Sequence, residues 1–366
     1  MNIEIDKNIK VFLSFDEIRN IFHKFSKLPN FSIQELGFSE DQNNIELLSY
    51  IKNSEIKNNI LLFGGEDASE PIFSQTIVWL ISELSKNDSF IHNFNLNWYF
   101  ISCINPDGYI KNKGWFNQVG DLKSFLENSW EDLHSRMIFW KTEERIEHKL
   151  LEKAIDIAKP MLIYNMHDES HFPADGYKFM FSTPIDLKLL KTHLNKIKQF
   201  MDISSEELVI TDSYGNNPKF SIYYALKNYE NTFIFGNESC GYKLVDNIAP
   251  KIFIDTNDEL YKALKDYKKL QLDNYNNILD SSIFHTNLLI KSIEEKEEFN
   301  TKMLSITGYG LEYLINLEIN DAKKIKSIFL NHINKYFKDT YKPIPVWQQV
   351  FTQLDFLFTM LNIKEI

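Results

Sequence analysis

Apolar residues follow two different spacings along this chain. In residues 14–27, one face of a helix would carry Ile18, Ile21, Phe22 and Phe25, and Ser14 is a residue type that suits the N-cap. Elsewhere, short apolar runs of strand length end at polar or glycine-containing turns. These runs occupy residues 31–38, 45–51, 59–63, 97–104, 161–166, 177–182, 207–211 and 231–235.

Helical patterns separate several of the predicted strands. They cover residues 74–86, 140–158 and 186–201. Strands that alternate with helices of this length predict an α/β layered fold with a largely parallel or mixed sheet. From about residue 276 the strand signals fade and helix-forming segments dominate. The sequence therefore predicts one α/β unit over residues 1–275 and a mainly helical C-terminal extension over residues 276–366.

Composition narrows the class of protein. The chain has 366 residues, of which 43% are hydrophobic and 25% charged, as in soluble globular proteins. A net charge of −11 argues against binding to nucleic acid, whose phosphates attract basic surfaces. No run of 18 apolar residues occurs, so we expect no membrane span. The N-terminus does not resemble a signal peptide and two cysteines cannot form a disulfide framework, so we expect a cytoplasmic protein.

Polar residues capable of chemistry follow three of the predicted strands. Asp67 and Glu70 come after the run 59–63, His167 comes after 161–166, and Glu238 comes after 231–235. In open α/β sheets, ligands gather at the carboxyl ends of the strands. Zn²⁺ accepts a nitrogen ligand and two carboxylates while leaving a position for water. Asp67, Glu70 and His167 are therefore candidate metal ligands, with Glu238 as the base that takes a proton from that water.

Two other interpretations compete for the same residues. Asp67 and Glu70 could instead cap a helix that begins near Pro71, because acidic groups are favoured at a helix N-terminus. Residues 167–171 resemble an HExxH zinc motif, but that motif needs a helix. A strand-like run precedes this segment and residues 172–176 would interrupt a helix, so we reject that interpretation. Cys103 and Cys240 are expected to be small buried residues.

Together these positions resemble the zinc metallocarboxypeptidases related to carboxypeptidase A. That family has a Gly-x-His-x-x-Glu turn after a strand, then Asn-Pro-Asp-Gly, then a strand ending in His, and a Glu on a later strand. Here residues 65–71 look like the first turn, residues 105–108 read Asn-Pro-Asp-Gly, and residues 143–167 resemble the segment that delivers the His. Residues 36–51 are similar to the family's early hairpin. The resemblance covers about residues 30 to 245.

The resemblance implies a three-layer α/β/α fold with a mixed, mostly parallel, roughly eight-stranded sheet, in which residues 1–275 form the catalytic domain. It also implies one zinc ion and cleavage of a peptide or amide bond near a free carboxylate. By motif position, Glu70 and His167 correspond to metal ligands and Glu238 to the general base. Tyr214 could correspond to the family's mobile tyrosine. Asp67 stands where the family has its first His, which would make the metal a weaker Lewis acid, a different ion, or absent.

Arginine usage gives a second departure from the family. Only three of the 40 basic residues are arginine, namely Arg19, Arg136 and Arg145. The family holds the substrate carboxylate with arginines in a stretch that here contains only lysines. Lys111, Lys113, Lys123 or Arg136 would have to bind the substrate instead, and an ammonium lacks the planar fork of a guanidinium.

Three hypotheses about function follow. The first is a metal-dependent hydrolase acting on a specialised peptide or amide. The second is a related deacylase that removes an acyl group from an N-acyl amino acid. The third is a catalytically inactive homologue that keeps the cleft as a binding module. The predicted partner is accordingly a peptide or N-acyl amino acid substrate, with neither nucleic acid nor membrane.

Overall fold

A computed structural model describes residues 3–68, 70–111, 145–169, 176–183, 185, 188–201, 207–211, 222–240, 242–244, 252–273, 280–297 and 341–363, with a few positions between 324 and 335. Among these residues, no helix has the length and apolar character needed to cross a membrane.

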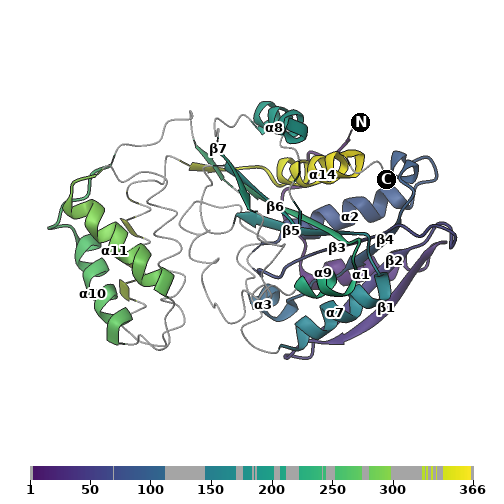
Figure 1. Ribbon diagram of the computed structural model, residues 1–366, viewed down its shortest axis with the longest axis horizontal. Coiled ribbons are helices and arrows are strands. Elements are labelled where there is room, and N and C mark those ends of the chain that lie inside the picture. The colour runs from purple at the N-terminus through teal and green to yellow at the C-terminus, as the bar shows by residue number, and fades with distance from the viewer. Residues whose placement is uncertain are drawn as a thin grey trace.

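A sheet of eight strands forms the centre of the fold (Figure 1), in the order β1-β2-β4-β3-β5-β8-β6-β7. Four of its seven strand pairings are parallel, and the other three, β1–β2, β2–β4 and β6–β8, are antiparallel. The mixed, mostly parallel, eight-stranded sheet is therefore confirmed. The strands are β1 Phe31–Phe38, β2 Asn44–Tyr50, β3 Asn59–Gly64, β4 Asn97–Ile101, β5 Leu162–Glu169, β6 Gly176–Phe181, β7 Glu207–Thr211 and β8 Phe233–Cys240.

Helices cover both faces of this sheet, which confirms the three-layer arrangement (Figure 1). One face carries α2 (Ile72–Leu84), α8 (Lys188–Met201) and α14 (Val346–Ile363). The other carries α7 (Ile146–Ala158) and α9 (Tyr223–Asn228). Successive side chains of a strand point to opposite faces. In β5, accordingly, Tyr164 packs in the first cluster and Ile163 in the second.

The predicted N-terminal helix is present as α1 (Phe15–Phe25). Ser14 and Glu17 form a capping box, in which each side chain bonds the other residue's backbone N–H. Phe15, Ile18 and Phe22 are its buried residues, because their spacing places them on one helical face. A short 3₁₀ helix, η1 (Phe90–Asn93), precedes β4.

Two central strands are longer than the sequence indicates. The apolar runs of β5 and β8 end at Met166 and Phe235, but the parallel ladder between them continues to Glu169 and Cys240. The prediction that His167 and Glu238 follow their strands is therefore wrong, because both lie within the ladder. Backbone hydrogen bonding, rather than apolar content, sets where these strands end.

The Asn-Pro-Asp-Gly segment begins α3 (Pro106–Lys111) and holds the β1–β2 hairpin. The Asn105 Oδ1 atom accepts from the backbone N–H of Gly108 at 3.1 Å. The buried Asp107 carboxylate accepts from the Ser39 hydroxyl, from the Asp41 N–H at 2.9 Å and from Asn43 Nδ2 at 2.8 Å. This motif therefore fixes a loop of the fold.

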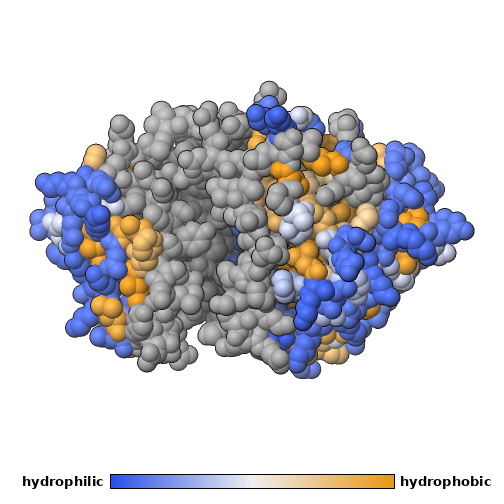
Figure 2. Space-filling model, in the orientation of Figure 1, coloured by the Kyte–Doolittle hydropathy of each residue, from blue (hydrophilic) through white to orange (hydrophobic). Residues whose placement is uncertain are grey.

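Two helices and a short pair of strands come after β8. The helices α10 (Glu259–Asp273) and α11 (Asp280–Glu294) pack on each other, and β9 (Tyr242–Leu244) pairs with β10 (Tyr341–Pro343). Figure 2 shows an apolar strip over α10 and α11, where Leu272 and Phe284 are more than half exposed. Past these elements, the chain returns to the sheet as α14.

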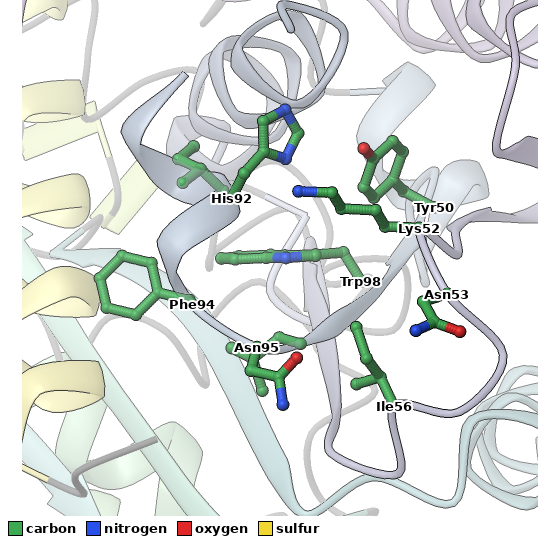
Figure 3. Close-up of a pocket in the computed structure, with 10 residues that line it drawn as sticks. Tyr50, Lys52, Asn53, Ile56, His92, Phe94, Asn95 and Trp98 are labelled. Atoms are coloured by element: carbon green, nitrogen blue, oxygen red, sulfur yellow. The ribbon is translucent and has the colours of Figure 1, made fainter. Parts of the chain in front are cut away.

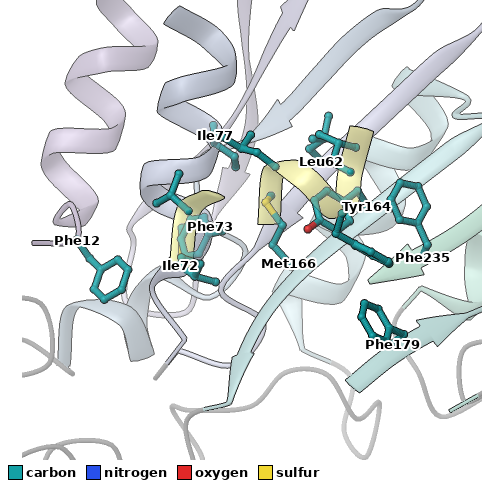
Figure 4. Packing of buried hydrophobic residues seen from close by; sticks show 14 of the residues in the cluster. Phe12, Leu62, Ile72, Phe73, Ile77, Tyr164, Met166, Phe179 and Phe235 are labelled. Atoms are coloured by element: carbon teal, nitrogen blue, oxygen red, sulfur yellow. The ribbon is translucent and has the colours of Figure 1, made fainter. Parts of the chain in front are cut away.

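The helix α14 belongs to the core of the first unit, although it lies beyond residue 275. Its Phe356 ring lies 4.9 Å from that of Phe179, 5.9 Å from Phe235 and 6.0 Å from Tyr164, measured between centroids. Tyr164, Phe179 and Phe235 gather in the same buried cluster as Leu62 and Met166 (Figure 4). The helix α14 therefore enlarges the core of the α/β unit.

Candidate functional site

The turn after β3 is shaped by two adjacent glycines. A Cβ atom on Gly64 would lie 2.4 Å from Phe73 Cβ and 2.9 Å from the Met166 carbonyl oxygen. Gly65 has φ +75°, and a Cβ there would lie 2.9 Å from Cys103 Sγ. Neither position therefore accepts a larger residue without strain. Cys103 is fully buried, as predicted, and this burial raises the pKa of its thiol.

Glu70, which follows this turn, bonds His167. The Glu70 Oε2 atom lies 2.7 Å from His167 Nδ1, and both side chains are buried. Helix α2 has Pro71 at its N-cap, with no side-chain cap hydrogen bond and no acidic residue in its first turn. Pro71 rather than an acidic residue therefore occupies the N-cap position, and Glu70 joins the turn to β5.

Glu66 and Asn165 add a second buried contact beside the same imidazole. Asn165 Nδ2 donates to Glu66 Oε2 at 2.6 Å, and this oxygen lies 4.0 Å from His167 Nε2. Both side chains are fully buried. The His167 ring thus has a carboxylate oxygen near each of its nitrogens. This arrangement restricts the rotation of the ring, as outer carboxylates do around metal-binding histidines.

Glu238 is the direct partner of His167 in the parallel ladder between β5 and β8. Paired residues of neighbouring strands project to the same face of a sheet. Ile163, four residues before His167, packs against the α7 and α9 side, so His167 and Glu238 belong to that side as well. Glu238 is only partly buried, whereas His167 is 6% exposed. The predicted base and one predicted ligand are therefore brought together.

Asp67 lies in the same turn and is buried, at 4% exposure. Its backbone carbonyl accepts from the Glu70 N–H at 3.1 Å, which closes the turn. Within the described ranges, no three His, Cys, Asp or Glu side chains are grouped so as to hold a metal ion. Glu70 Oε2 and His167 Nδ1 stand at hydrogen-bond distance, closer than the ~3.3 Å that separates two ligands of one tetrahedral zinc. The three residue types are ones that zinc accepts as ligands. Of these three candidates, the described structure brings Glu70 and His167 into contact.

Four predicted substrate-binding residues, Lys113, Lys123, Arg136 and Tyr214, lie outside the described residues. Lys111, from the same lysine-containing stretch, and Arg19 are among the basic residues that the structure describes. Lys111 lies 3.3 Å from the Asp41 carboxylate at the β1–β2 hairpin. Arg19 lies on α1 with its Nε atom 3.3 Å from Glu46 Oε2.

Sequence reasoning missed Glu66, Asn165 and Gln353. Gln353 Nε2 donates to the main-chain oxygen of His167 at 2.7 Å. The alternation of a strand was a usable signal for Asn165, since it lies two residues before His167. Glu66 is visible in the motif but has no counterpart among the family's ligands. For Gln353 the only signal was a polar residue within an apolar helical segment.

The structure also contains a pocket of about 380 Å³ at the other end of the strands (Figure 3). Tyr50, Lys52, His92 and Trp98 are among the residues that line it. Trp98 and Leu162 both pair with Ile60, so Trp98 lies at the level of Leu162, near the start of β5. His167 lies five residues further along β5, so this pocket is separate from the candidate site.

Comparison with known proteins finds a similarity in the N-terminal third of the chain. Residues 19–125 match the zinc carboxypeptidase family model. The chain is 31% identical over 80 residues to carboxypeptidase B of Astacus astacus, a match that covers 21% of this chain and 26% of that protein. The chain therefore spans about a quarter of the length of this relative.

Two solved carboxypeptidase structures were also compared with this chain. Carboxypeptidase A of Helicoverpa armigera superposes with a TM-score of 0.44 and 13% identity, over 62% of this chain and 64% of that one. A metallo-carboxypeptidase of Burkholderia cenocepacia gives a TM-score of 0.41 and 13% identity, over 88% and 69%. Because both scores are below 0.5, these structures add nothing to the sequence match. That match shows a similarity to the zinc carboxypeptidases over residues 19–125, the part of the chain that includes the glycine turn.

Proposed function

We propose that this protein is a metal-dependent hydrolase that cleaves a peptide or amide bond next to a free carboxylate. The observation that supports this most is the placement of His167, which bonds Glu70 and pairs in register with Glu238 at the carboxyl ends of β5 and β8. Ligands bind at this end of open α/β sheets. A base beside a candidate metal ligand is what hydrolysis by water requires.

Glu70 and His167 would hold the metal, with Asp67 as the third ligand. When bound, a zinc ion supplies acidity to a coordinated water and polarises a carbonyl group. The turn offers carboxylate oxygens of the kind that zinc accepts, since Glu66, Asp67 and Glu70 are all acidic and at least 96% buried.

The side chains of the protein would then have separate roles in the reaction. Glu238 would take a proton from the attacking water and deliver it to the leaving nitrogen, since it is partly exposed and shares a face with His167. Glu66 and Asn165 would hold the His167 ring in one orientation. We propose Lys113, Lys123 or Arg136 for the substrate carboxylate, and Tyr214 as a further substrate contact.

The test combines metal analysis with hydrolysis. Purified protein is equilibrated with Zn²⁺, dialysed, and its bound zinc measured, for the wild type and for Glu70→Gln and His167→Gln. We expect one zinc per chain in the wild type and loss in both variants. His193→Gln is the matched control, because His193 Nδ1 lies 2.7 Å from Asp355 Oδ2 in an equally buried pair between α8 and α14. Zinc retained by both site variants would overturn the proposed ligands.

Substrates distinguish the remaining alternatives. Release of a C-terminal amino acid from peptides supports the proposal, whereas hydrolysis of N-acyl amino acids alone would indicate a deacylase. The presence of Asp67 favours a second candidate, an inactive homologue that binds substrate without cleaving it. For that candidate we expect no bound zinc in the wild type and restored zinc binding in Asp67→His.

A further inference from the structure

Gln353 places an amide side chain inside the apolar core between α14 and the sheet. Its exposure is 0%, and its neighbours on the helix, Val350, Leu354 and Leu357, belong to the hydrophobic cluster. An amide removed from water costs free energy unless its donor and acceptor are both bonded. Gln353 meets this condition, because the amide nitrogen and the amide oxygen each contact β5.

The two contacts of this amide lie three residues apart on one strand. Nε2 donates to the main-chain oxygen of His167 at 2.7 Å, and Oε1 accepts from the Tyr164 hydroxyl. The Tyr164 hydroxyl also lies 2.7 Å from Asn237 Oδ1 on β8. Burial raises the pKa of Tyr164 well above its ordinary value, so the hydroxyl keeps its proton. Tyr164 lies beside Phe235 in this cluster, with ring centroids 4.9 Å apart (Figure 4).

The network therefore reaches both strands that carry the site. On β5 it holds the backbone of His167 itself, and on β8 it reaches Asn237, the residue before Glu238. The ladder of β5 with β3 ends at Met166, one residue before His167. The amide from α14 thus holds the strand where the pairing with β3 has stopped.

We propose that Gln353 is a positioning residue for the candidate site, which acts through the backbone of His167 and through Tyr164. Its kinetic consequence depends on the proposed hydrolase function, whereas its effect on the His167 ring does not. A displacement of a catalytic group by a fraction of an ångström lowers the rate of a reaction while leaving substrate binding nearly intact. The C-terminal helix α14 would in this way influence the reaction rate at a site on the opposite face of the sheet.

The experiment compares Gln353→Met with Gln349→Met. Gln349 lies one turn earlier on α14, is also buried, and donates to the Ile344 carbonyl at 2.8 Å instead of to the sheet. Two measurements are made, namely the imidazole ¹H–¹³C NMR signals of His167, assigned with His167→Gln, and kcat and KM for a peptide substrate. For Gln353→Met we expect shifted His167 signals and a kcat lowered about tenfold with little change in KM. Gln349→Met should change neither.

Unshifted His167 signals in Gln353→Met, or equal shifts in both variants, would overturn the positioning role. If Gln353→Met does not fold, Tyr164→Phe takes its place, because it removes only the hydroxyl from the network. Wild-type His167 signals in folded Tyr164→Phe would then count against the proposal. If the wild-type protein hydrolyses no substrate, the proposed function fails, while the NMR comparison still decides the role of Gln353.

Discussion

His167 and Glu238 occupy matching positions on adjacent parallel strands, and their side chains project to the same face of the sheet. The two residues are 71 positions apart in the sequence. Because the β5–β8 ladder is regular from Leu162–Phe233 through Glu169–Cys240, their relative placement is fixed by backbone pairing. A site built on strands in this way is held more rigidly than one built on loops.

The first prediction concerns Glu238. Glu238→Gln keeps the size of the side chain and removes its basicity, so we expect hydrolysis to fall by about 10²- to 10⁴-fold with zinc content unchanged. Glu35→Gln on the exposed side of β1 serves as the control and should retain wild-type turnover. An unchanged rate in Glu238→Gln would assign the base to another residue.

The second prediction concerns the glycine turn. Gly64→Ala introduces a Cβ at 2.4 Å from Phe73 Cβ, next to the backbone of Met166. Neither neighbour is the flexible end of a side chain, so we expect a loss of about 1–3 kcal/mol in the free energy of unfolding. Urea denaturation measures it, with Ser54→Ala at an exposed position as the control. Wild-type stability in Gly64→Ala would show that the turn can move away.

The third prediction concerns the Asn-Pro-Asp-Gly segment. Asp107→Asn cannot accept all three hydrogen bonds that hold the β1–β2 hairpin. Since bonds to a charged acceptor are stronger than neutral ones, we expect the free energy of unfolding to fall by about 2–3 kcal/mol. Asp41→Asn is the matched control in the same loop, because its contact with Lys111 is exposed and worth about 0–1 kcal/mol. Equal losses in the two variants would contradict the structural role of Asp107.

The fourth prediction concerns pH and the pair that joins α8 to α14. Burial lowers the pKa of His193 below its ordinary 6.5. For Asp355, burial alone would raise the pKa, but hydrogen bonds from His193 and Lys196 outweigh it and lower the pKa below 3.8. A neutral imidazole therefore donates to an ionised carboxylate, with Lys196 Nζ at 2.8 Å from the same group.

The sign of the pH effect follows from this pair. Below about pH 6.5 the unfolded chain protonates His193 more readily than the folded chain does, so stability is lost as the pH falls. The Asp355 contribution is lost only at lower pH, as the pH falls past 3.8. Urea denaturation of wild type and His193→Asn at pH 7.5, 6.5 and 5.5 measures the effect. We expect His193→Asn to be less stable at pH 7.5 and to show a smaller loss toward pH 5.5. If the free energy of unfolding depended on pH identically in both proteins, this prediction would be contradicted.

Much of the fold could be predicted from local pattern. The spacing of Ile18 and Phe22 indicates α1, and the apolar run before Gly64 indicates β3, because a buried strand and an amphipathic helix each impose their own period. The ends of β5 and β8 could not be predicted, since His167 and Glu238 are polar residues. Their strand conformation depends on pairing with a partner distant in the sequence.

The sequence by itself determined which residues at the candidate site are chemically capable, namely Asp67, Glu70, His167 and Glu238, and the layered fold that brings strand ends together. These follow from residue type, spacing and hydrophobic period, which are local properties of the chain. Only the tertiary structure decided that Glu70 bonds His167 and that Glu66 lies near the other nitrogen of the imidazole. It also decided that Gln353 donates to the main-chain oxygen of His167. These contacts join segments that are 97 to 186 residues apart in the sequence. They depend on how the layers pack against each other, which no local pattern encodes.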